Sequence, residues 1–149
     1  AGGWSFNSWG DPKNPLSGGL TGDSPETGIP ARALEIKAVP VNYAGRATGV
    51  IKLAPNLREL VLRGEFTLSR DYRGNRPRVF FWSGKSAHFF DLPAAKPGET
   101  KRFEIVLPVA ELPAGTGGVN LQLISQFDEK QSAAPAGSVY FRSVVLTGR

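Results

Sequence analysis

Apolar and polar residues alternate along several short stretches of this chain, which is the pattern expected of strands with one buried face. The clearest stretch is residues 58–68, in which Leu60, Leu62, Phe66 and Leu68 fall on one face and mainly charged or polar residues fall on the other. Similar short runs predict further strands at residues 33–39, 49–53, 79–82, 87–92, 100–107, 119–127 and 138–147. A sustained period of 3.6 residues bounded by caps is missing from the sequence, so we expect little helix.

Turn-forming residues separate these stretches. The 149 residues include 18 Gly and 12 Pro, and residues 83–86 form a plausible hairpin turn. Residues 10–32 are polar and lack apolar periodicity, so we interpret them as a functional loop or a segment wrapped around the domain. Many short strands joined by turns predict an all-β fold in one domain spanning residues 1–149, a two-sheet antiparallel β-sandwich with a jelly roll as its leading version.

Composition narrows the chemistry. The chain has no Cys and a single histidine, His88, which excludes disulfides, thiol catalysis and metal sites of the His/Cys kind. A Ser-His-Asp triad would have to use His88, and a structural role for it is the better expectation. The net charge of +5 weakly favours anionic partners and also serves solubility. No apolar run approaches the roughly 20 residues that span a bilayer, so we expect no membrane association.

The chain also lacks Met, including at position 1. We therefore expect a processed product or a segment of a longer, multidomain protein.

Aromatic motifs mark both ends of the chain, GGWSF at residues 2–6 and GSVYFRSVVLT at 137–147. Between them come ALEI at 33–36, GEFTL at 64–68, FFW at 80–82 and PGETKRF at 97–103. In this order the motifs resemble the galactose-binding-like β-sandwich of carbohydrate-binding modules appended to secreted glycoside hydrolases. The resemblance implies a secreted, non-catalytic module. Its partners would be a polysaccharide or oligosaccharide and a parent catalytic domain, with neither nucleic acid nor membrane expected.

Modules of this type often hold a structural calcium through an Asp in the closing strand. Arg142 occupies that position here, and a cation would face its guanidinium, so we expect that calcium site to be absent or replaced. Asp11, Asp23 and Glu26 leave a weaker loop site open. We therefore predict no cofactor.

Sugar rings stack their C–H faces on flat aromatic side chains, and their hydroxyls need fixed hydrogen-bond donors and acceptors. Trp82 and Tyr43 are the first candidates for stacking, because one ends an aromatic strand and the other lies in a polar segment. Trp9 and Tyr72 follow them.

Hydrogen bonds to the sugar are expected from Asn120, Gln122, Gln126 and Arg63. The amides alternate with apolar residues along residues 119–127, which would form a polar ladder on one sheet face. An ordinary polar outer face explains the same alternation equally well.

Residues 70–78, which we call the arginine loop, concentrate four arginines, Arg73 among them, around Tyr72. The guanidinium fork suits carboxylate, sulfate or phosphate groups. On a sugar-binding domain such a loop indicates a uronic-acid or sulfated glycan as ligand. On a nucleic-acid-binding domain it would be a basic loop with a stacking tyrosine. The third interpretation is a loop that is simply solvated.

Two other functions stay open. A small jelly-roll glycosidase or polysaccharide lyase would use Glu59, Glu65 or Glu104, although arginines nearby in the sequence favour a charge-balanced sheet face. A structural or interaction sandwich would bind no ligand of its own. We expect the binding module and no enzyme activity.

Overall fold

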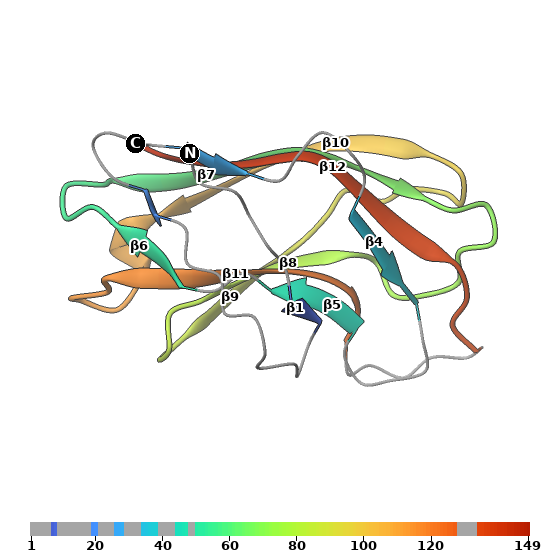
Figure 1. Ribbon diagram of the computed structural model, residues 1–149, viewed down its shortest axis with the longest axis horizontal. Helices are drawn as coiled ribbons and strands as arrows, with labels where there is room; N and C mark the ends of the chain where they lie inside the picture. Colours follow the sequence, from blue (N-terminus) through green and yellow to red (C-terminus); the bar gives the residue numbers. More distant parts are fainter. Residues whose placement is uncertain are drawn as a thin grey trace.

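The chain folds into two β-sheets packed face to face, seen as an upper and a lower layer in Figure 1. The computed structural model describes residues 7–8, 19–20, 26–28, 34–38, 44–47, 50–127 and 134–149. Among these residues the first sheet has five strands, all antiparallel. In order they are β10 (Thr100–Pro108), β7 (Glu59–Leu68), β12 (Ser138–Gly148) and β3 (Glu26–Gly28), with β4 (Leu34–Lys37) also paired to β12.

The second sheet has seven strands within the same described ranges, centred on β11 (Gly118–Gln126). Its main path runs through β1 (Asn7–Ser8), β5 (Ala44–Ala47), β11, β6 (Ile51–Leu53) and β2 (Gly19–Leu20). β8 (Arg78–Trp82) also pairs with β11, and β9 (Ala87–Asp91) pairs with β8. All pairs are antiparallel except the two-residue β2–β6 pair. The predicted all-β, two-sheet antiparallel sandwich is confirmed.

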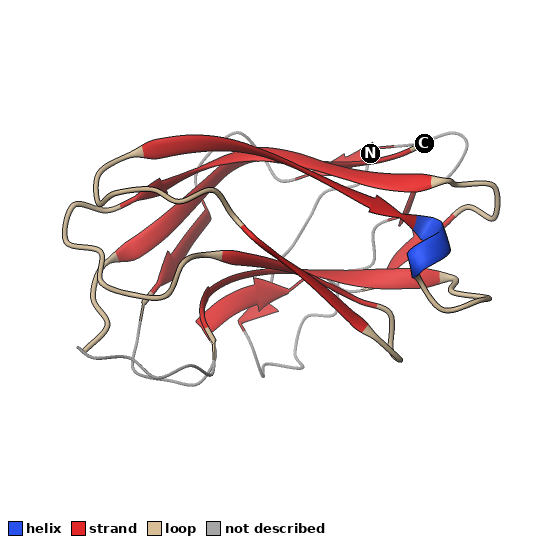
Figure 2. Ribbon diagram, turned by 180° about the vertical axis from the view of Figure 1, so that it is seen from behind, coloured by secondary structure: helices blue, strands red, loops and turns tan. Residues whose placement is uncertain are grey.

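Helix is as scarce in the described residues as the sequence predicts. One turn of 3-10 helix, Val109–Glu111, follows β10 at one end of the sandwich (Figure 2).

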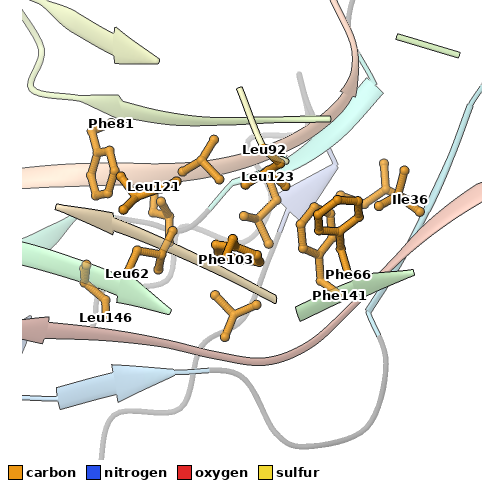
Figure 3. Close-up of a cluster of buried hydrophobic side chains, with 14 of the residues drawn as sticks. Ile36, Leu62, Phe66, Phe81, Leu92, Phe103, Leu121, Leu123, Phe141 and Leu146 are labelled. Carbon is orange, nitrogen blue, oxygen red and sulfur yellow. The ribbon is translucent and has the colours of Figure 1, made fainter. Parts of the chain in front are cut away.

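The core lies between the sheets, where the alternating apolar residues of both layers meet (Figure 3). Phe66 on β7, Phe103 on β10 and Phe141 on β12 pack against one another with ring centroids 6.3–6.4 Å apart. From the other sheet, Phe81 and Leu121 are fully buried. Full burial of a large apolar side chain contributes roughly 1.5–3 kcal/mol, so this alternation is what drives the two sheets together.

A β-bulge on β12 changes which residues point into the core. Arg142 lies opposite Glu65 and Val145 lies opposite Arg63, so β12 carries one extra residue against β7. Ser143 takes up this extra residue at a φ of 51°, in the left-handed region. The bulge shifts the alternation, so that Val144 is buried where simple alternation would expose it.

The sequence missed the shortest strands. Residues 10–32 are not entirely loop, because β2 and β3 lie within them. β5 begins directly after Tyr43, in the segment that the sequence shows as polar. Strands of two to four residues are too short to show an alternation, and their pairing partners define them instead.

Candidate functional site

The outer face of the seven-stranded sheet carries a row of aromatic side chains. Phe81 is fully buried, so its neighbours Phe80 and Trp82 on β8 point away from the core. Across the β8–β9 hairpin, Phe80 lies opposite Phe89. Phe89 is 54% exposed and Trp82 is 39% exposed. We call Phe80, Trp82 and Phe89 the aromatic face.

Two of these rings pack on each other. The Phe80 and Phe89 rings stack with centroids 5.3 Å apart and an interplanar angle of 29°. On the other side of β8, the register places Asn120 beside Trp82 and Gln122 beside Phe80. An exposed aromatic ring with an amide beside it, as at Trp82 and Asn120, is the combination that a sugar ring needs.

Arg78 closes one end of the aromatic face. Its Nε lies 2.7 Å from Asp91 Oδ1, and its guanidinium lies 5.0 Å from the centroid of the Phe89 ring. The same guanidinium lies 3.8 Å from the centroid of the Phe127 ring. The ion pair between Arg78 and Asp91 therefore fixes a charged group beside the Phe89 and Phe127 rings.

The amide ladder predicted on β11 exists only in part. Asn120 is half-buried and bonded within the protein. Gln122 is 8% exposed, and its Oε1 has no hydrogen-bond partner within the described ranges. Gln126 is 1% exposed and its Oε1 accepts a hydrogen bond from the main-chain N–H of Asn75 at 2.8 Å. Gln126 is therefore not available on the sheet face as the alternation predicted, since a bulge on β11 after Ile124 turns the strand there.

Tyr72 does not serve as a stacking platform either, because it is buried. Its hydroxyl lies within hydrogen-bonding distance of the carbonyl oxygens of Asn75 and of Ser125, the latter at 3.3 Å. Burial raises the pKa of the Tyr72 hydroxyl. Tyr72 thus anchors the arginine loop from beneath, whereas Arg73 on the same loop is exposed.

Arg63 lies on the wrong side of the sandwich to meet Trp82. It belongs to β7, and its Nε pairs with Glu104 Oε2 at 2.6 Å on the outer face of the five-stranded sheet. The prediction that Arg63 and Trp82 contact one ligand is wrong, because the hydrophobic core separates the two outer faces.

The candidate carboxylates for catalysis share that opposite face. Glu104 pairs with Arg63, and Glu59 Oε1 lies 3.0 Å from Arg149 Nε. Glu65 lies between Arg102 and Arg142 in the strand register. These carboxylates form the charge-balanced surface that the neighbouring arginines suggested.

Several predicted residues lie outside the described residues, namely Tyr43, Trp9, Asp11 and Asp23, and of Glu26 only the main chain is described. Arg142, at the position of the expected calcium ligand, donates from Nη1 to Thr67 Oγ1 at 3.4 Å. In the part of the chain that is described, no three acidic or histidine side chains gather as a metal site. Nor does any helix there have the length and apolar character needed to cross a membrane.

Two pockets flank the ends of β8. One, of about 320 Å³, is lined by Arg73, Arg76 and the apolar residues Pro77, Ala94 and Ala95, and we call it the loop pocket. The other, of about 260 Å³, follows Trp82 and is lined by Ser83, Lys85 and glycine-rich residues 113–118, together with Asn120.

Sequence reasoning overlooked Phe80, Phe89 and Arg78. A signal was available, because the predicted turn at residues 83–86 sets the register of the two strands that it joins. Counting back from that turn places Phe80 opposite Phe89 and Arg78 opposite Asp91.

Comparison with known proteins finds the fold but no family. No protein-family model matches the chain, and neither does any curated protein. Among solved structures, the enzymatically active domain of tailspike protein 4 from bacteriophage CBA120 matches with a TM-score of 0.53 and 11% sequence identity. The match covers 100% of this chain and 18% of the tailspike chain. This protein is therefore a β-sandwich domain with the fold of a small part of that tailspike structure.

Proposed function

We propose that the domain is a non-catalytic carbohydrate-binding module whose glycan lies on the aromatic face. The observation that carries the proposal is the exposed pair of rings Trp82 and Phe89, of which Phe89 stacks on the half-buried Phe80 and Trp82 has Asn120 beside it. A pyranose ring would place its C–H face on these rings and direct its hydroxyls to the polar groups around them.

In this function the domain tethers a parent enzyme to its substrate. A secreted polysaccharide-degrading enzyme would gain local substrate concentration from such a module, with no new bond-breaking step. The tailspike match, in which a sandwich of this fold is one part of a longer, enzymatically active structure, supports an accessory position. No cofactor is part of the proposal, since stacking and hydrogen bonding need none.

Affinity electrophoresis against neutral and acidic polysaccharides tests the proposal. We expect retardation by at least one glycan without release of product. We expect Trp82→Ala and Phe89→Ala each to weaken binding about tenfold or more, as for a central aromatic contact.

Val106→Ala is the matched control. Val106 is 39% exposed, as Trp82 is, but lies on β10 in the other sheet, so its loss should leave binding unchanged. Unaltered binding by both aromatic variants would overturn the proposed site. Glycan cleavage that is abolished by Glu104→Gln would overturn the non-catalytic function.

A further inference from the structure

We propose that the loop pocket binds the anionic group of an acidic sugar residue, so that the ligand of this domain is an acidic glycan, a polyuronate or a sulfated polysaccharide. The inference rests on the proposed function and adds the class of glycan. It starts from two arginines, Arg73 and Arg76, that line one pocket.

Arg73 presents a guanidinium on a fixed main chain. Its N–H and C=O exchange hydrogen bonds with Ala136 at 2.8 and 2.7 Å, which pins the loop at that residue. Its side chain is exposed, and within the described ranges it forms no ion pair.

Arg76 is oriented by the neighbouring loop. Its Nε donates to the main-chain oxygen of Leu92 at 2.5 Å, so the position of the guanidinium is set by the backbone. A guanidinium held through Nε still has its two terminal nitrogens, and these are the groups that form parallel hydrogen bonds with a carboxylate or sulfate.

Among the described residues, the nearby carboxylates form no ion pair with these two arginines. Asp71 Oδ1 accepts a hydrogen bond from the Ser69 hydroxyl at 2.7 Å and lies beside Gly137, on the side of β12. Glu99 Oε1 accepts from the main-chain N–H of Lys96 at 2.7 Å, with Lys101 nearby. Within the part of the chain that is described, the loop pocket therefore carries two guanidinium charges that an anionic ligand would balance.

The remaining surface of the loop pocket suits a sugar ring. Pro77, Ala94 and Ala95 give it an apolar wall, and its volume of about 320 Å³ is within the usual range of ligand pockets. An apolar wall together with two arginines in the same lining matches a ring with one C–H face and one anionic substituent. A phosphate backbone would need a longer basic track.

The arginine loop is also rigid enough to preorganise these groups. Asn75 receives a hydrogen bond from the main-chain N–H of Phe127 through its Oδ1 and donates its own N–H to Gln126. Since the loop is already ordered, binding would cost less conformational entropy than binding by a free loop.

The test uses the 149-residue chain with four probes: polygalacturonate, dextran sulfate, a neutral galactan and poly(U) RNA. We expect an acidic glycan to bind at least about tenfold more tightly than the galactan at low salt, and the preference to shrink as NaCl is added. We expect Arg73→Gln to remove most of that preference, about tenfold in Kd, and Arg73→Glu to remove it completely. Arg102→Gln makes the same charge change on the other sheet and should leave the preference intact.

Polygalacturonate preferred over dextran sulfate identifies the anion as a carboxylate, and the reverse identifies a sulfate. Either result supports the inference if it depends on Arg73. The inference is overturned by wild-type affinity in both Arg73 variants, provided that their thermal unfolding is unchanged, and also by tighter binding of poly(U) than of either acidic glycan. Galactan binding that equals or exceeds the binding of both acidic glycans, and that is lost in Trp82→Ala but not in Arg73→Gln, would refute the inference and leave the proposed function intact. No binding to any glycan would refute both.

Discussion

The side-chain oxygen of Gln126 accepts a hydrogen bond from the main-chain N–H of Asn75 at 2.8 Å. In return, Asn75 Oδ1 accepts the main-chain N–H of Phe127 at 3.1 Å. Two amide side chains thus join the end of β11 to the arginine loop, out of contact with solvent on the β11 side. A residue that its sequence position suggested for ligand binding is instead what positions the loop.

Replacing Gln126 with Leu should therefore destabilise the domain by about 1–3 kcal/mol, because it leaves the part-buried N–H of Asn75 without this acceptor. Urea unfolding monitored by Trp fluorescence would measure the loss. Gln122→Leu is the control, since the Oε1 of Gln122 has no partner within the described residues and its replacement should change stability by less than about 1 kcal/mol. Equal effects of the two substitutions would show that the hydrogen bond to Asn75 contributes little.

Gly74 is a second determinant of the arginine loop. A Cβ at this position would lie 2.5 Å from Gln126 Oε1 and 2.7 Å from the Tyr72 hydroxyl oxygen. Gly74→Ala should cost about 1–3 kcal/mol through this overpacking, whereas Gly117→Ala, with open space around its Cβ, should cost far less. Thermal unfolding of the two variants side by side tests the difference, and matching transition temperatures would contradict it.

Arg78 links the aromatic face to the edge of the sheet. Its side chain is 19% exposed, it pairs with Asp91, and it lies over the Phe127 ring. Arg78→Met keeps the apolar stem but removes the charge, so we expect a loss of about 1–2 kcal/mol from the cation–π contact and the ion pair. Asp91→Asn, at an exposed partner, should lose less than about 1 kcal/mol. A larger loss for Asp91→Asn than for Arg78→Met would reverse this order of contributions.

Glu35 should give the domain part of its pH dependence. Hydrogen bonds from the Ser138 hydroxyl at 2.8 Å and the Tyr140 hydroxyl at 3.1 Å hold the pKa of the Glu35 carboxyl below its usual value. The unfolded chain then takes up a proton at a higher pH than the folded one. The stabilisation is complete above the ordinary pKa of Glu and is lost as the pH falls through the lowered pKa.

Glu35→Gln should therefore be less stable than the parent at neutral pH and should lose less stability on acidification. Urea midpoints measured from pH 7 to pH 3 would show the two curves converging at the acid end. Parallel curves would assign the acid sensitivity to other carboxylates. Glu104→Gln, which breaks an exposed surface pair, serves as the control.

The candidate site separates into parts that were predictable and parts that were not. Trp82 was predictable, because an aromatic residue at the end of an alternating strand beside a turn tends to face outward. The pairing of Phe80 with Phe89 beside it depends on the hairpin register, and the turn alone only suggests that register. The burial of Gln126 depended on a bulge in β11 and on the packing of the arginine loop, and neither leaves a local trace in the sequence.

For the fold, the sequence by itself determined the long strands and the class of architecture. The period-2 alternation of residues such as Leu60, Leu62 and Phe66 states which face of a strand is buried, and that information is local. Only the tertiary structure decided which strands share a sheet. Arg63 therefore faces away from Trp82, although both residues lie on the outward face of strands that the sequence predicted.

The same division explains the short strands and the bulge. β2, β3 and β5 exist because a neighbouring strand supplies hydrogen-bond partners, and the bulge at Ser143 exists because β7 and β12 must keep both Phe141 and Val144 in the core. Burial of apolar surface is encoded residue by residue, whereas pairing and register depend on segments far apart in the chain. The physical reason is that alternation reflects only which face of a strand gains free energy by leaving water. The pairing and register of the strands depend on contacts that form when the sheets pack together.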